Sequence, residues 1–267
     1  MKMIFELCRQ EAIKLFSNRY PYLLLGIIFA VQAAYMIAHA ASPPETTLDE
    51  LTAPQLWADG AAVALRLELF IVLVLGAMGF SQEFAQGTVK TVLTLPIRRV
   101  QWVAAKLLSL ALLSWAILLV FSLLGIAIVA FALGWGDVTR SGVLLYHQSE
   151  VWKSLLAAVG LTAIFLLPVC AFALLVSAFF SSSGAAVGVA LVLAIVLEFG
   201  LGLLDRSAKF VFLHHLQVPV STLGKMGKGL PFDWSDTLTW GVPVTLISTA
   251  VLAGWLAVRM ERMDITE

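Results

Sequence analysis

Long apolar segments dominate this chain, and short polar segments separate them. The hydrocarbon core of a bilayer is about 30 Å thick, and about 20 helical residues are needed to cross it. Apolar segments of that length are too uniform for the alternating strands of a membrane β-barrel. The pattern therefore predicts an all-α integral membrane protein with six transmembrane helices, at roughly 20–41, 61–80, 107–133, 154–180, 185–204 and 239–258.

The composition supports this class. Hydrophobic residues make up 60% of the 267 positions and charged residues 13%, whereas a soluble domain carries about 25% charged residues. The formal net charge is zero, so we expect no nucleic-acid partner. Cys8 and Cys170 lie in different surroundings without metal-ligand spacing, and neither a disulfide nor a metal site is predicted. We treat residues 1–267 as a single transmembrane domain.

The basic residues predict an orientation, because cytoplasmic loops carry an excess of lysine and arginine. With the N-terminus inside, six spans return the C-terminus to the same side. The outer segments then hold Arg140, Lys153, Arg206, Lys209, Lys225 and Lys228. The inner segments hold the larger set of Lys2, Arg9, Lys14, Arg19, Lys90, Arg98, Arg99, Lys106, Arg259 and Arg262. We therefore expect both termini to be cytoplasmic.

Three segments outside the spans have features of their own. Residues 1–19 alternate apolar and charged positions as in an amphipathic helix at the inner interface, although an ordinary charged anchor fits equally well. Residues 81–106 are polar and basic and lie between two apolar spans. Residues 205–238 include an apolar stretch too short to cross the membrane, which predicts an interfacial or re-entrant outer element before the last span.

Within the spans, Pro168 predicts a kink, since proline removes a backbone hydrogen bond. Gly184 and Gly188 form a G-x-x-x-G pattern, which favours close approach of another helix.

Ionisable residues inside spans are costly and therefore informative. Arg66 and Glu68 are two positions apart on one helix and point in nearly opposite directions, so they cannot pair with each other. Our hypothesis is that Arg66 pairs with Glu198 on the fifth span, while Glu68 faces a polar cavity or another subunit. Alternatively, all three side chains lie shallow and reach the outer water by snorkelling.

The sequence contains no recognisable catalytic motif: no Walker motif, no G-x-S-x-G and no H-E-x-x-H. We therefore expect a non-catalytic membrane subunit that takes any energy from a partner. The histidines, which include the adjacent His214 and His215, fall at predicted outer positions. They are interpreted as interfacial residues, with a metal site as the weaker alternative.

The segment 81–106 carries a recognisable series of residues. It reads Glu83-x-x-x-Gly87-Thr88, then Leu93-Thr94-x-Pro96, then Arg98-Arg99, and finally Lys106 at the start of the next span. This series resembles the first cytoplasmic loop of ABC-2 type transporter permeases. An R-x-E element (Arg9, Glu11) before the first span and a short basic tail (Arg262, Met263, Asp264, Ile265) are also similar to that family, so the resemblance covers essentially the whole chain.

The resemblance implies a type V exporter-like permease in the cytoplasmic (inner) membrane. It implies a coupling helix in the 81–106 loop that docks on a separate cytoplasmic ABC ATPase subunit, which binds the ATP and magnesium. This chain itself would hold no cofactor. Six spans are half the usual complement, which implies a second permease copy or a paralogous permease. The candidate coupling residues are Glu83, Gly87, Thr88, Leu93, Pro96, Arg98, Arg99 and Lys106.

The residue chemistry fits that role. Gly87 permits a bend, Thr88 can cap the helix that follows, and Pro96 can stop it. Arg98 and Arg99 can bind acidic groups on the ATPase or lipid phosphates, although positive-inside anchoring alone would also explain them.

Two other classes of function stay open. The first is a non-transporting membrane anchor or mechanical transmission subunit for an ATPase. The second is a membrane-embedded enzyme that modifies lipids, which would need clustered polar residues at the inner interface. The sequence does not identify a transported substrate.

Overall fold

The computed structural model of the chain describes residues 2–17, 20–42, 51–89, 98–140 and 143–263. Almost all of the described elements are helices. In chain order they are α1 (Lys2–Ser17), α2 (Tyr20–Ala41), α3 (Ala53–Ala85), α5 (Arg99–Ala132), β1 (Val138–Arg140), β2 (Val143–Tyr146), α6 (Gln148–Phe165), α7 (Leu167–Ser177), α8 (Ser183–Leu204), η2 (Asp205–Phe210), α9 (Phe212–Leu216), α10 (Val218–Gly227), η3 (Thr237–Gly241) and α11 (Val242–Glu261).

Six helical segments are long and apolar enough to cross a membrane, and they fall where the hydropathy pattern predicted spans. They are Tyr22–Ala41, Ala53–Ala85, Arg99–Ala132, Gln148–Ser177, Ser183–Leu201 and Thr237–Glu261. The prediction of an all-α protein with six membrane-spanning helices is therefore confirmed in the number and approximate position of these helices. The second span begins earlier than predicted, because Pro54 starts α3 within the segment expected to be an outer loop.

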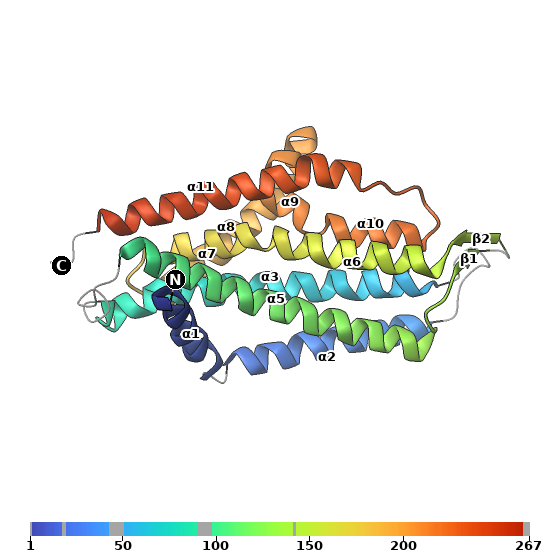
Figure 1. Cartoon of the computed structure of the whole chain (residues 1–267), viewed down its shortest axis with the longest axis horizontal. Helices are drawn as coiled ribbons and strands as arrows, with labels where there is room; N and C mark the ends of the chain where they lie inside the picture. Colours follow the sequence, from blue (N-terminus) through green and yellow to red (C-terminus); the bar gives the residue numbers. More distant parts are fainter. Residues whose placement is uncertain (1, 18–19, 43–50, 90–97, 141–142, 264–267) are drawn as a thin grey trace.

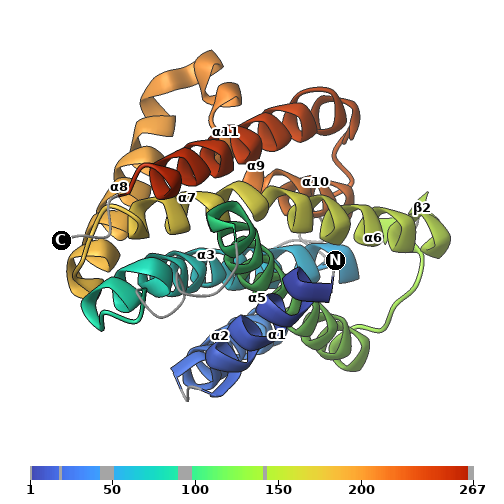
Figure 2. The same ribbon diagram turned by 60° about the vertical axis from the view of Figure 1, so that its left-hand side comes forward.

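Helix α3 lies at the centre of the bundle. It packs against α2, α5, α7, α8 and α10, and α2 and α11 lie on opposite sides of it in both views (Figures 1 and 2). Helix α1 runs at an angle to the spans and packs against α5. In Figure 1, α1 and the C-terminal end of α11 lie toward the same end of the bundle. An even number of spans requires this arrangement.

Close packing around α3 depends on a glycine that the sequence pattern did not single out. A Cβ added at Gly76 would lie 2.4 Å from the Cβ of Ala173 on α7, so only glycine lets these helices approach so closely. By contrast, no atom of the described residues lies within 4 Å of a Cβ at Gly184 or Gly188. The close approach predicted for that G-x-x-x-G pattern does not occur among them.

The fourth span is interrupted where proline predicted a kink. Helix α6 ends at Phe165 and α7 begins at Leu167, with Pro168 in its first turn. The far end of α7 is tied to α3, since the Ser177 Oγ accepts hydrogen bonds from the backbone N–H groups of Phe80 and Ser81 at 2.8 and 2.9 Å. A side chain inserted against a helix backbone in this way favours a local bend.

The segment 205–238 folds back onto the bundle. Helix α10 packs against α3 and α6, and the Thr52 hydroxyl before α3 donates to the Gly227 carbonyl at its end, at 2.9 Å. The re-entrant or interfacial position of this segment relative to the membrane stays a prediction. The short antiparallel β1–β2 hairpin was not predicted; it precedes α6, and beside it Trp135 stacks on Trp152 with ring centroids 4.9 Å apart.

Candidate functional site

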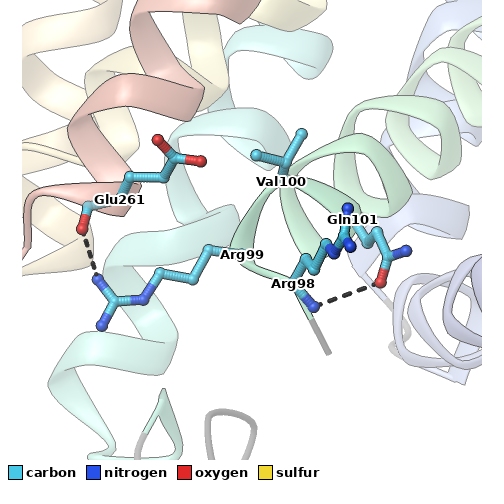
Figure 3. A pocket seen from close by; sticks show the side chains of 5 residues that line it. All are labelled: Arg98, Arg99, Val100, Gln101 and Glu261. Carbon is cyan, nitrogen blue, oxygen red and sulfur yellow. Dashed lines mark hydrogen bonds between the residues drawn. The ribbon is translucent and has the colours of Figure 1, made fainter. Parts of the chain in front are cut away.

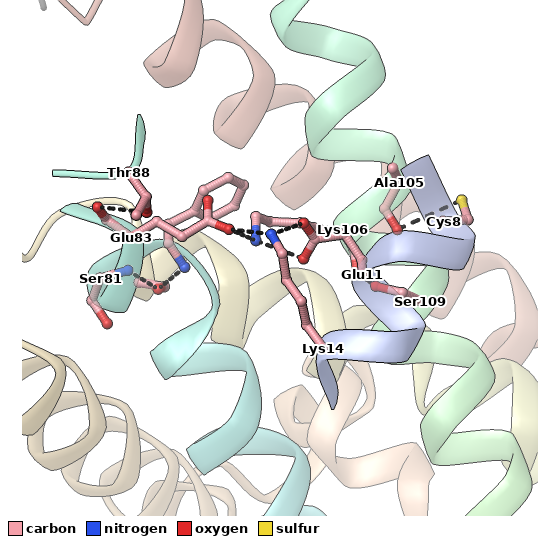
Figure 4. A network of polar contacts seen from close by, with 11 residues as sticks. Cys8, Glu11, Lys14, Ser81, Glu83, Thr88, Ala105, Lys106 and Ser109 are labelled. Carbon is pink, nitrogen blue, oxygen red and sulfur yellow. Dashed lines mark hydrogen bonds and ion pairs between the residues drawn. The ribbon is translucent and has the colours of Figure 1, made fainter. Parts of the chain in front are cut away.

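Four charged side chains from three helices meet near the end of the bundle where α1 lies (Figure 4). Lys106 Nζ on α5 lies 2.9 Å from Glu11 Oε2 on α1 and 3.0 Å from Glu83 Oε1 in the last turn of α3. Lys14 Nζ lies 2.9 Å from Glu11 Oε1 and 3.2 Å from the same Glu83 oxygen. We refer to Glu11, Lys14, Glu83 and Lys106 as the charge cluster. Each carboxylate contacts both ammonium groups.

Burial makes the charge cluster more than a surface ion pair. The Lys106 side chain is 5% exposed, Glu83 11% and Glu11 12%, whereas Lys14 is 58% exposed. The Lys106 ammonium also lies 5.3 Å from the ring centroid of Phe80, a cation–π distance. A lysine removed from water needs such compensation, because an unpaired buried charge is strongly destabilising.

The local sequence explains why α1 can deliver its two charges. Glu11 and Lys14 are three positions apart and therefore lie on the same face of a helix. On that side of α1, the Cys8 Sγ lies 3.8 Å from the Ala105 carbonyl of α5, with Cys8 buried in the contact. The carbonyl of Ala105 immediately precedes Lys106, so the docking of α1 places Glu11 within reach of the lysine.

Electrostatics at the charge cluster stabilises the charged forms of Glu11 and Lys14. Burial on its own would raise the pKa of Glu11, but attraction to Lys106 and hydrogen bonds from both lysines outweigh it and hold that pKa below its usual value. Burial would likewise lower the pKa of Lys14, yet its hydrogen bond to Glu11 and the attraction of both carboxylates leave it raised. At neutral pH both groups are therefore ionised, and the cluster joins α1 to α3 and α5.

The turn after α3 closes on the backbone of the cluster residue Glu83. Gly87 has a φ of +67°, a left-handed conformation that glycine adopts without strain, and the predicted bend is present. The Thr88 N–H and hydroxyl both donate to the Glu83 carbonyl, at 3.1 and 3.3 Å. These bonds close the end of α3. The residues that Thr88 was expected to cap follow Val89 and lie outside the described residues. Leu93 and Pro96 lie outside the described residues.

The two arginines at the start of α5 have different surroundings (Figure 3). One guanidinium nitrogen of Arg99, Nη1, donates to the carbonyls of Met260, Glu261 and Met263 at 2.8–2.9 Å, and so binds the C-terminal end of α11. Arg98 is exposed on an open pocket between the two helices, and its backbone N–H donates to Gln101 Oε1 at 3.3 Å. Arg98 is thus the arginine whose side chain is available to a partner.

The charges inside the spans are not arranged as predicted. No ion pair joins Arg66 to Glu198 among the described residues, and both side chains are exposed on the outer surface of this chain. Glu68 is fully buried inside the chain and so does not face another subunit. The physical reason is helix rotation: α3 turns Glu68 towards its neighbours, which leaves Arg66 on the opposite side.

Sequence reasoning missed Lys14 as part of the site and treated Glu11 only as one position of an R-x-E element. The available signal was the pair of opposite charges at positions 11 and 14 of an amphipathic segment, facing the same way as apolar residues. The partners of that pair lie 69 and 95 positions away along the chain. Only the docking of α1 identifies them.

Comparison with known proteins identifies the family. The profile of a family described as "Protein of unknown function (DUF2705)" matches residues 16–266. Because the match extends over most of the sequence, the chain belongs to this family. No curated protein matches the chain.

Proposed function

We propose that this member of the DUF2705 family is the transmembrane permease subunit of an ABC-2 type exporter, moved by ATP that a separate cytoplasmic ATPase subunit binds and hydrolyses. The observation that carries the proposal is the charge cluster. Three of its members stand at the positions of three separate elements of the ABC-2 resemblance: Glu11 before the first span, Glu83 ahead of the Gly-Thr pair, and Lys106 at the start of the third span. They come from distant parts of the sequence, yet they form one set of ion pairs.

This convergence supports a mechanical role for the loop. The loop between α3 and α5 leaves α3 at Gly87 and enters α5 at Arg98, and the charge cluster ties the two helices together just behind it. Glu11 adds α1 to the same unit. A force applied to the loop by a cytoplasmic partner is therefore transmitted to α1, α3 and α5 together. It is not absorbed by extension of the loop.

A second contact extends the unit to the last span. Arg99 holds three carbonyls at the end of α11, so a shift of the α5 start also shifts α11. Helix α3, at the centre of the bundle, would pass the movement to the helices packed on it. Such a sliding or tilting of packed helices is the kind of gating transition that alternates access to a pathway.

The remaining loop residues supply docking chemistry. The exposed Arg98 can bind an acidic group on the ATPase, bidentately where the geometry allows. In this proposal the loop side of the bundle is cytoplasmic, the protein lies in the cytoplasmic membrane among its lipids, and a second permease copy or a paralogue completes the pathway. The transported substrate is unassigned.

The test is purification of the tagged full chain from its native membrane in mild detergent. We expect an ATPase with a Walker motif to be recovered with the wild-type chain and largely lost with Arg98→Glu. The matched control is Lys153→Glu, an exposed charge reversal in the second turn of α6. Helix α6 begins beside β2, at the end of the bundle away from α1 (Figure 1). Recovery of no such ATPase with the wild type, under conditions that keep the chain folded, would refute the proposal.

A second measurement separates an exporter from a mechanical anchor. In vesicles that contain both subunits, an exporter accumulates a substrate that also stimulates ATP hydrolysis. An anchor binds the ATPase and shows neither effect.

A further inference from the structure

Glu68 is a carboxylic residue in the middle of the central span. It is residue 16 of the 33 in α3, and at 1.5 Å per residue it lies about 23 Å from one end and about 26 Å from the other. Its side chain has no exposed surface. Neither carboxyl oxygen has a hydrogen-bond partner among the described residues. A group this costly in a membrane core is a candidate for function.

No basic side chain in the described part of the chain compensates it. Arg66, two positions earlier, is exposed on the other side of the helix. The Cys170 thiol on α7 is near enough to interact with Glu68 electrostatically, and it lies 3.8 Å from the Ser114 hydroxyl of α5. Among the described residues, α2, α5, α7, α8 and α10 pack against α3, and their titratable residues are Tyr20, Tyr22, Tyr35, His39, Arg99, Lys106, Cys170, Glu198 and Lys225.

Of these residues, Cys170 is uncharged in such a setting and Glu198 is exposed. Lys106 is engaged with Glu83 in the charge cluster, about 23 Å further along α3 at 1.5 Å per residue. Glu68 forms no ion pair with any of them among the described residues. A bare carboxylate in such a site is very unfavourable. A bound proton removes the charge and requires no further space.

A metal cation is less suited than a proton to neutralise the Glu68 carboxylate. Hard cations require a shell of several oxygen ligands, and the described residues contain no group of three His, Cys, Asp or Glu side chains that could hold one. The Cys170 thiol interacts with Glu68 and the Ser114 hydroxyl contacts that thiol, and these two groups do not supply such a shell. The chemistry of the site therefore fits the smallest cation, the proton.

We propose that Glu68 is a proton-binding site inside the membrane domain, which keeps its proton while α3, α5 and α7 are packed together and releases it when they separate. On release, the O–H bond of the acid breaks, the electron pair stays on the carboxylate, and the proton passes to a water molecule that enters between the helices. Opening of the core is thereby linked to the proton concentration. This inference rests on the packing of α3 alone and stands whether or not an ATPase binds the loop.

The first test uses the wild-type full chain in vesicles of phosphatidylethanolamine and phosphatidylglycerol. At about pH 8, Asp and Glu side chains in contact with water are ionised. We expect an infrared C=O band of a protonated carboxylic acid to persist at that pH, and to vanish in Glu68→Gln. Glu198→Gln is the matched control and keeps the band. Absence of any acid band from the wild type at about pH 8 would overturn the proposal without need of a variant.

Two further measurements test the nature and the release of the ligand. The acid band should be equally strong in sodium chloride and in choline chloride at the same ionic strength. If the band is lost with sodium alone, Glu68 binds a metal cation and the proposal is wrong. Gly76→Ala, which forces α3 from α7, should lower the pH at which the band disappears. The control Gly184→Ala should not. Equal pH dependence in Gly76→Ala and wild type would refute the link to helix separation.

Discussion

Lys106 Nζ lies 3.0 Å from Glu83 Oε1, across the loop that separates α3 from α5. The two residues flank the polar segment on either side and are both buried. Their contact closes the loop at its base. This ion pair joins the end of α3 to the start of α5, and Glu11 attaches α1 to the same unit.

Removal of the central charge should weaken this unit strongly. Lys106→Met leaves Glu11 and Glu83 buried together with Lys14 as their remaining partner in the charge cluster. We expect a loss of about 3–5 kcal/mol of stability, the usual cost when one partner of a buried ion pair is deleted. Thermal unfolding in detergent measures it. Lys153→Met, at an exposed position, should change little; equal losses in the two variants would contradict the role of the cluster.

The charge cluster also predicts a dependence on pH. Because the folded pKa of Glu11 is lowered, its contribution to stability is present above its unfolded pKa of about 4.3 and is lost as the pH falls through the folded value. Because the folded pKa of Lys14 is raised, its contribution is present below about pH 10.4 and is lost as the pH rises through the folded value.

The measurement for this prediction is the melting temperature against pH. The wild type should lose stability on the acid side of about pH 4 more steeply than Glu11→Gln. If the curves of melting temperature against pH coincide below about pH 4 for the two proteins, the pKa of Glu11 is not lowered in the folded state.

The turn at Gly87 should tolerate glycine and little else. Its φ of +67° disfavours side chains, although a Cβ there would meet no atom within 4 Å. Gly87→Val should therefore cost about 1–2 kcal/mol through backbone strain alone. Gly254→Ala in α11, also in open space but helical, should be neutral or slightly stabilising. If chemical denaturation gives the same midpoint for Gly87→Val and wild type, the turn is not fixed in this conformation.

Arg99 should hold the end of α11 in place. Arg99→Ala removes the donor to three backbone carbonyls, and charged hydrogen bonds contribute about 1.5–3 kcal/mol. We expect trypsin to cut after the exposed Arg262 about tenfold faster in this variant. Arg98→Ala is the control, since among the described residues the Arg98 side chain makes no hydrogen bond to α11. Cleavage at the wild-type rate in Arg99→Ala would mean that α11 is anchored elsewhere.

The contact between α3 and α7 should be sensitive to a single methyl group. Gly76→Ala places a Cβ 2.4 Å from that of Ala173 and 2.9 Å from a methyl of Leu110, and we expect a loss of about 1–3 kcal/mol from overpacking. The control is Gly188→Ala, where space is open. Equal melting temperatures for Gly76→Ala, Gly188→Ala and wild type would show that α3 and α7 can separate freely.

Much of the fold could be predicted because its signals are local. A segment of about 20 apolar residues must form a helix in lipid, since only a helix satisfies its backbone within the segment. The break at Pro168 follows from one missing N–H group. The β1–β2 hairpin and the early start of α3 were missed because the segments between the spans carry no strong periodicity.

The candidate site could be predicted only in part. The sequence placed Glu83, Gly87 and Lys106 in or beside one loop, but it could not show which side chains contact Glu83 and Lys106. Similarly, local helical geometry separated Arg66 from Glu68 but could not tell which of the two faced inward.

The sequence by itself determined the membrane class, the approximate spans and the polar segment between α3 and α5, since hydropathy and helical length act within a segment. Only the tertiary structure decided that Glu11 and Lys14 reach Glu83 and Lys106, that Arg99 binds the end of α11, and that Glu68 is enclosed. Those contacts depend on how each helix is tilted and rotated about its axis. That orientation is set by packing against other helices, and the sequence of one segment does not specify which helices those are.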